Sequence, residues 1–176
     1  DGQTMLIDCN YADSAEEDIL EYLDEIIEKS EGSKKVLDYL VNTHPDEDHL
    51  RGIKILSEKF EIGNIWESGY RFDDGIDRPH YEDFLSLIKV KGSSILSASE
   101  TPYEVGDVNF YCFNSSENSD DGNKDVHCNC LVIKMSYAGS SVLFAGDSNF
   151  KCWEERIVKF GNLLDSTYLH ASHHGS

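Results

Sequence analysis

VLDYLVNTHPDEDHL, residues 36–50, is the stretch of this sequence that decides the fold. Its first six residues, Val36–Val41, form an apolar run of the length expected for a buried strand. The run leads directly into the polar segment His44-Pro45-Asp46-Glu47-Asp48-His49. An apolar pattern with helical spacing follows at Leu50, Ile53, Leu56 and Phe60. Polar residues between a strand and a helix occupy the position where α/β sheets carry their functional sites.

The chemistry of residues 44–49 points to metal. Imidazole nitrogen and carboxylate oxygen are ligand atoms for zinc, manganese and iron. Pro45 restricts His44 to an extended conformation, so we expect the ligands to be arranged round a tight turn and not in a helix. The alternative interpretation is a solvated acidic turn that caps the helix at Leu50, because such residues are common near helix starts.

Two later segments have the same placement. Leu143-Phe144-Ala145-Gly146-Asp147-Ser148 is an apolar strand ending in Gly-Asp, which by itself indicates only a turn. His170-Ala171-Ser172-His173-His174-Gly175-Ser176 follows another short strand. A lone histidine is more often a surface or core residue than a ligand, but two adjacent histidines at a strand end favour a site. All three segments lie at carboxyl ends of predicted strands.

The order of these segments resembles that of the metallo-β-lactamase-fold superfamily, where His-x-His-x-Asp-His precedes a Gly-Asp and a last histidine. Asp46 stands at the position of the second histidine. His-Pro-Asp-x-Asp-His with a later Ser-His-His-Gly-Ser is similar to the metallo-hydrolase domain of the competence protein ComEC and its relatives. Residues 4–10 and 129–133 also resemble strands of those relatives, so the similarity covers nearly the whole chain.

The resemblance implies an α/β fold, a metallo-β-lactamase-like αββα sandwich that forms a single domain over residues 1–176. The abrupt first and last residues suggest a fragment, incomplete at both ends. The residue patterns predict helices over 19–27, 50–60, 81–88 and 150–160, the first preceded by a capping box at 14–17. They predict strands over 4–9, 36–41, 62–66, 103–105, 108–113, 130–136, 141–145 and 167–169.

A dinuclear site with two divalent metal ions, zinc or manganese, is also implied by the resemblance. The implied ligands are His44 and Asp46 for one metal, Asp48, His49 and His173 for the other, and Asp147 between them. Asp48 and Asp147 are the implied catalytic residues. Asp8 would orient ligands from behind, a role that tunes metal affinity.

Three further histidines are alternative metal or substrate contacts. His127 lies near the position of a middle histidine that ComEC-like members commonly lack, and it is otherwise a loop residue. His174 competes with His173, which we prefer because it follows Ser172 as the corresponding ligand does in relatives. Cys128 and Cys130 could join His127 if they shared one face of a strand. His80 lies in the loop 69–81, where aromatic residues and arginines mix; this loop either stacks on a base or simply connects two elements.

The charge and the cysteine content limit the function classes and the cellular compartments that fit this sequence. The chain has 34 Asp and Glu against 15 Lys and Arg, a formal charge of −19, which excludes a simple basic-patch binder of nucleic acid. Five cysteines without a C-x-x-C pair favour free thiols in a reducing, cytoplasmic compartment. No apolar run is long enough to span a membrane.

The implied function is a metal-dependent hydrolase that uses a metal-activated water. Three ligand carboxylates and two divalent ions leave the site at about +1, which suits an anionic substrate such as a phosphodiester, in a nucleic acid or nucleotide. The alternatives are a small-molecule hydrolase of lactones, thioesters or β-lactams, and a metal-binding module without catalysis.

Overall fold

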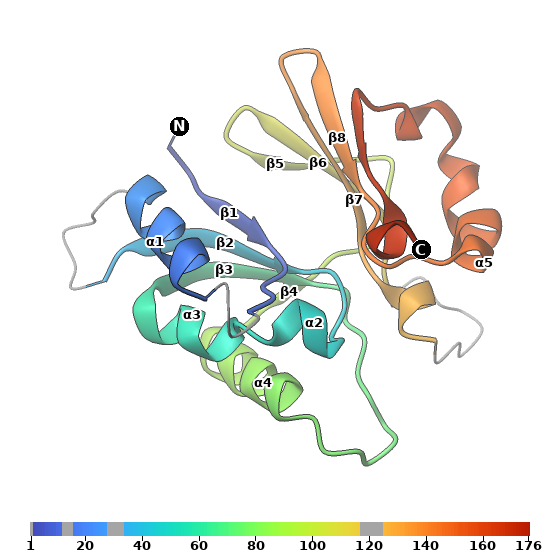
Figure 1. Cartoon of the computed structure of the whole chain (residues 1–176). Coiled ribbons are helices and arrows are strands. Elements are labelled where there is room, and N and C mark those ends of the chain that lie inside the picture. The colour runs from blue at the N-terminus through green and yellow to red at the C-terminus, as the bar shows by residue number, and fades with distance from the viewer. Residues whose placement is uncertain (1, 12–15, 28–33, 117–124) are drawn as a thin grey trace. The chain divides into compact units, whose positions relative to one another are not determined.

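The structure is a computed structural model of the chain, and it describes all residues except 1, 12–15, 28–33 and 117–124 (Figure 1). The chain forms two compact units. Residues 2–66 and 72–94 make up the N-terminal unit, and residues 67–71 and 95–176 make up the C-terminal unit. The chain therefore crosses from one unit to the other more than once. The two sheets and the helices between their strands give the α/β class that the sequence resemblance implied.

The first sheet has the order β1-β2-β3-β4 (Figure 1). Its strands are β1 (Met5–Ile7), β2 (Val36–Asn42), β3 (Glu61–Glu67) and β4 (Ser94–Ile95). β1 and β2 are parallel, with Leu6 opposite Leu40. The helices are α1 (Glu16–Ile26), α2 (Glu47–Leu50), α3 (Ile53–Lys59) and α4 (Pro79–Lys91). Apolar side chains of strands and helices share one buried core, which includes Leu40, Leu56 and Phe84.

The second sheet has the order β5-β6-β7-β8-β9. Its strands are β5 (Tyr103–Val105), β6 (Val108–Asn114), β7 (Val132–Tyr137), β8 (Ser140–Phe144) and β9 (Tyr168–His170). β5 to β8 pair antiparallel, whereas β8 and β9 are parallel. α5 (Phe150–Cys152) continues as a π-helical turn over Trp153–Ile157 and as 3₁₀ turns over Val158–Leu164. Phe113, Val132, Leu143 and Ile157 are among the residues of this unit's core.

The predicted order of strands and helices is confirmed, with four differences. The predicted helix over 50–60 is two helices, α2 and α3, that meet at Gly52. A Cβ on Gly52 would lie 1.9 Å from the Tyr11 ring, so the chain breaks where only glycine allows this close approach. The predicted helix over 150–160 is a succession of α, π and 3₁₀ turns. The β7–β8 turn lies at residues 138–139, one residue earlier than predicted, and β4 was not predicted.

Two further observations concern limits of the described chain. The predicted capping box at residues 14–17 lies outside the residues whose side chains are described. None of the helices in the described ranges combines the length and the apolar character that a membrane crossing requires.

Candidate metal centre

The first group of candidate ligands lies in the N-terminal unit, where β2 ends and α2 begins. His44 Nε2 lies 3.5 Å from Asp46 Oδ2, and His49 Nε2 lies 3.7 Å from Asp48 Oδ2. The centroids of the two imidazole rings are 4.0 Å apart. Four side chains of residue types that bind divalent metals therefore converge within one six-residue segment, which we call the first ligand group.

Hydrogen bonds behind this group set the orientation of both rings. The Thr43 backbone N–H and hydroxyl each donate to the Asp8 carboxylate at 2.7 Å. Since the only hydroxyl proton of Thr43 goes to Asp8, its oxygen at 3.0 Å accepts from His44 Nδ1. His49 Nδ1 donates to Asp8 Oδ2 at 2.7 Å. Both rings thus carry their proton on Nδ1, and both Nε2 lone pairs face the carboxylate side, as metal ligation requires.

The backbone of the first ligand group differs in part from the prediction. α2 begins at Glu47, with Asp46 as its N-cap at φ −71° and ψ 153°. Asp48 and His49 therefore lie in a helical turn, and the prediction of a non-helical turn is wrong for these two residues. Pro45 restricts only the residue before it, so the chain is able to wind into a helix directly after Asp46.

The burial of the first ligand group disfavours the alternative of a solvated acidic cap. His44 is fully buried and His49 is 6% exposed. The Asp46 side chain makes no capping hydrogen bond to α2. Cys9 is also near, but burial and the neighbouring Asp8 charge raise the pKa of its thiol to about 12, so it is not a thiolate ligand at neutral pH.

The second group of candidate ligands lies in the C-terminal unit and consists of His127, Asp147 and His173. One ligand atom from each lies within 4.8 Å of the others. Asp147 Oδ2 is 3.8 Å from His173 Nε2 and 3.5 Å from His174 Nε2. Asp147 is 4% exposed, so its carboxylate is buried beside two imidazoles. We call these three residues the second ligand group.

Turns with unusual backbone angles position the second ligand group. Gly146 has φ 52°, whereas His173 and His174 have φ 48° and 54°, values that cost free energy for residues with a Cβ. The His173 N–H donates to the Gly146 carbonyl at 3.1 Å, and the Ser172 hydroxyl donates to the Ser148 carbonyl. The turn after β9 is thereby bonded to the turn after β8. Two left-handed histidines in succession are a feature of a functional turn more than of a stable connection.

The cysteine hypothesis fails on geometry. Cys128 lies in a 3₁₀ turn, His127–Asn129, and not in a strand, so it does not share a strand face with Cys130. The Cys128 thiol donates to Asn149 Oδ1, and the Cys130 thiol lies 3.9 Å from the Ala145 carbonyl. Both thiols are fully buried. They pack in the core, while His127 reaches the second ligand group.

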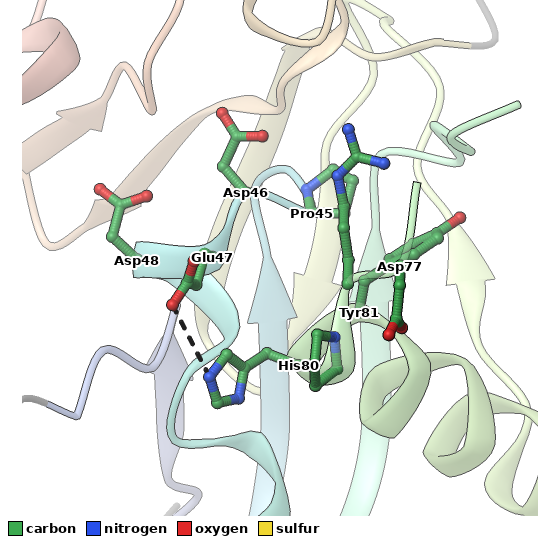
Figure 2. Close-up of a pocket in the computed structure, with 9 residues that line it drawn as sticks. Pro45, Asp46, Glu47, Asp48, Asp77, His80 and Tyr81 are labelled. Atoms are coloured by element: carbon green, nitrogen blue, oxygen red, sulfur yellow. Dashed lines mark ion pairs between the residues drawn. The ribbon is translucent and has the colours of Figure 1, made fainter. Parts of the chain in front are cut away.

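A pocket of about 430 Å³ adjoins the first ligand group inside the N-terminal unit (Figure 2). Residues from the ligand turn and from the start of α4 line it: Pro45, Asp46, Glu47, Asp48, Asp77, Arg78, Pro79, His80 and Tyr81. Figure 2 shows the Glu47 carboxylate directed at His80, with the two closest atoms 3.8 Å apart, and Asp46 and Asp48 directed away from it. The structure therefore places His80 at the pocket and outside the ligand group.

The sequence matches the family described as "Metallo-beta-lactamase superfamily" over residues 1–95, which include β1 to β4 and the first ligand group. This match covers more than half of the chain. The protein belongs to the metallo-β-lactamase superfamily. No curated protein sequence matches it significantly.

Three solved structures are similar to this superfamily member at low identity. The metallo-β-lactamase fold protein YhfI from Bacillus subtilis has 15% identity and a TM-score of 0.49, covering 83% of this chain and 51% of its own. Zinc-bound PqqB from Methylobacterium extorquens has 15% identity and a TM-score of 0.46, covering 82% and 45%. A diphosphatase of the PhnP family has 16% identity and a TM-score of 0.41, covering 88% and 53%. The chain spans about half the length of the structures it matches.

One residue near the ligands was not found by sequence reasoning. Thr43 orients His44, and a hydroxyl residue directly before a ligand histidine could have drawn attention to it. Arg78 belongs to the loop 69–81, for which the sequence left open stacking on a base or a simple connection. The structure places Arg78 at the pocket beside the first ligand group.

Proposed function

We propose that this protein is a metal-dependent hydrolase with two divalent cations, zinc or manganese, that cleaves phosphodiesters. The observation that carries the proposal is the first ligand group, with two buried imidazoles held by their Nδ1 protons and two carboxylates facing their Nε2 atoms. The donor set of the described residues fits such cations, because nitrogen and oxygen ligands suit zinc and manganese.

In this proposal, six side chains would ligate the metals. His44 and Asp46 would hold one cation, and Asp48, His49 and His173 would hold the other. Asp147 would be a ligand shared by the two cations. The assignment rests on the order of these residues in the sequence, which resembles the ComEC-type hydrolase domain, and on superfamily membership. His127 is an additional donor in the second ligand group.

When bound, the cations would supply Lewis acidity that lowers the pKa of water and stabilises the negative charge on the phosphate oxygens. The chain itself does the positioning. Asp8 and Thr43 hold protons at His49 Nδ1 and His44 Nδ1, so that neither ring is able to turn away. Asp48 and Asp147 orient the attacking water as acceptors, and His174, whose side chain is 58% exposed, donates a hydrogen bond toward the leaving oxygen.

The charge balance favours an anionic substrate. Asp46, Asp48 and Asp147 contribute three negative charges, and two divalent cations contribute four positive ones. The resulting site carries about +1 within a chain of −19, so it attracts a phosphodiester that the rest of the surface repels. Asp46 in place of a histidine shifts the metal preference toward harder ions such as Mn²⁺.

The test is a comparison of substrates with the metal-reconstituted protein. Bis(4-nitrophenyl) phosphate, an N-acyl homoserine lactone and a chromogenic β-lactam are supplied separately, with Mn²⁺ or Zn²⁺ present. We expect metal-dependent release of nitrophenolate and negligible turnover of the other two. Preferential hydrolysis of the lactone or the β-lactam would replace the phosphodiesterase assignment, and no metal uptake under any condition would end it.

A further inference from the structure

The pocket beside the first ligand group is a feature that the ligand assignment leaves unexplained. Its volume of about 430 Å³ lies in the range of small-molecule sites, roughly 300–1,000 Å³. Asp46 and Asp48 form part of its wall. A phosphate ester that engages these two residues through their metals therefore extends one of its substituents into this pocket, which contains Arg78 and His80 on the side of α4.

Arg78 is held rigidly at the pocket wall. Its two terminal nitrogens donate to the two Asp74 carboxylate oxygens at 2.7 and 2.9 Å. The guanidinium carbon lies 3.8 Å from the centroid of the Phe72 ring. Phe72 in turn meets Tyr81 edge to face, with centroids 5.1 Å apart and planes at 88°. We call Arg78, Asp74, Phe72 and Tyr81 the Arg78 platform.

The Arg78 platform offers a ligand a planar guanidinium surface whose charge is largely compensated. The bidentate pair with Asp74 compensates the guanidinium charge and occupies its terminal N–H groups on one side. Arg78 lines the pocket, and its guanidinium lies over the Phe72 ring. A planar, delocalised cation backed by an aromatic ring stacks readily on a further ring.

The remaining charges of the pocket disfavour a second phosphate there. Besides Asp46 and Asp48, the wall includes the carboxylates of Glu47 and Asp77 (Figure 2). Glu47 is paired with Arg51 at 3.1 Å, and its carboxylate also lies 3.8 Å from His80 Nε2. A neutral ring fits these surroundings, and its amino or imino N–H groups are able to donate to a carboxylate. A polyanionic strand does not fit, because like charges repel at short range.

We infer that the Arg78 platform binds a nucleobase, so that the substrates of the site are esters with a single nucleoside next to the phosphate. This inference rests on the proposed phosphodiesterase function. The base stacks on the guanidinium of Arg78 while the phosphate is attacked at the metals. Specificity then comes from a planar ring in the pocket and not from a chain of phosphates.

The inference is tested with two esters that share one leaving group. Thymidine 5′-(4-nitrophenyl phosphate) has a base, and methyl 4-nitrophenyl phosphate has none. We expect kcat/KM of the native protein to favour the thymidine ester by about tenfold or more, as one stacked base provides. Arg78→Ala and Arg78→Lys both lose most of that preference, measured as the ratio of kcat/KM for the two esters, because alanine removes the guanidinium and lysine keeps the charge without the plane. Lys89→Ala, an exposed lysine farther along α4, is the matched control and keeps the preference.

A binding measurement separates this inference from the proposed function. Calorimetric titration of the metal-loaded protein compares thymidine 5′-monophosphate with ribose 5-phosphate, and needs no turnover. A native protein that binds the two equally, or an Arg78→Lys variant that keeps the full preference, overturns the nucleobase site even if phosphodiesters are hydrolysed. If neither ester is hydrolysed, the proposed function fails, and tighter binding of the nucleotide that depends on Arg78 still supports the base site.

Discussion

The two ligand groups are built in different ways. In the first, hydrogen bonds between side chains orient both imidazoles: Thr43 bonds to His44 Nδ1, and Asp8 bonds to His49 Nδ1. Both rings are buried. In the second, a backbone bond to Gly146 and a left-handed φ angle orient His173, whose side chain is 44% exposed. The first group is therefore preorganised by a hydrogen-bonded shell, whereas the second depends on the conformation of a turn.

From this contrast, we expect the loss of a metal to have different consequences at the two ligand groups. Removing the metal from the first group leaves its rings oriented by Asp8 and Thr43. The exposed His173 of the second group lies in a turn that contains two residues in a costly backbone conformation. We expect the first group to dominate metal affinity and the second to be more sensitive to single substitutions. The following predictions test this difference, in order of decreasing effect.

Asp147→Asn is expected to have the largest effect. The asparagine keeps the shape but removes a charge that compensates both cations, so we expect one metal equivalent to be lost and hydrolysis to fall more than about 100-fold. The fold survives, because the substitution is isosteric. Elemental analysis and turnover of bis(4-nitrophenyl) phosphate measure both effects.

Asp107→Asn is the control for this substitution, since it makes the same change at an exposed turn of the same unit. It keeps both metals and full turnover. If the Asp147→Asn protein bound two metals and had normal activity, Asp147 would not be a ligand shared by the two cations.

A comparison of His173→Ala with His174→Ala tests which histidine ligates. Only His173 joins His127 and Asp147 within 4.8 Å, so we expect His173→Ala to weaken the affinity for the second metal about 10- to 100-fold. His174→Ala changes that affinity less than about threefold and lowers kcat. Titration with Mn²⁺ of each variant measures the difference. The opposite ranking would move the ligand by one residue.

Asp8→Asn tests the shell behind the first ligand group. The asparagine amide accepts hydrogen bonds from His49 Nδ1 and Thr43 less strongly than the carboxylate does. We therefore expect metal affinity to fall about 10-fold, because substitution of a residue that hydrogen-bonds to a metal ligand lowers the affinity about 10- to 100-fold. Asp38→Asn is the matched control: Asp38 also accepts bonds from a threonine, Thr4, at 2.8 and 2.9 Å, but contacts no candidate ligand. It leaves the metal Kd unchanged. Equal losses in the two variants would argue for a general effect on the sheet.

The smallest effect concerns pH and the Arg78 platform. Hydrogen bonds from Arg78 lower the pKa of Asp74 from its ordinary 3.8 to about 2. A depressed pKa means that the pair contributes fully above about pH 4 and is lost as pH falls through about 2. The preference for the thymidine ester is therefore flat between pH 5 and pH 8. Asp74→Asn lowers the preference about two- to threefold at every pH between these limits, measured as the ratio of kcat/KM for the two esters, and an unchanged ratio would show that Asp74 does not support the platform.

The local pattern of the sequence was sufficient for most elements and for the members of both ligand groups. Strand β2, helix α4 and the hairpins of the second sheet follow from alternation, helical spacing and turn residues. The break at Gly52 did not follow, because it depends on Tyr11, a residue 41 positions away. The irregular helix over 150–164 did not follow either, since its apolar spacing is compatible with α, π and 3₁₀ turns alike.

The sequence by itself determined the donor set, because residue types and their order at strand ends define which side chains are able to bind a cation. It also determined the formal charge of −19 that surrounds these donors. Only the tertiary structure decided which imidazole nitrogen carries the proton, since Asp8 and Thr43 reach His49 and His44 through the pairing of β1 with β2. It likewise decided that Arg78 lines a pocket with Asp46, because the distance between residues far apart in sequence is set by packing and not by local pattern.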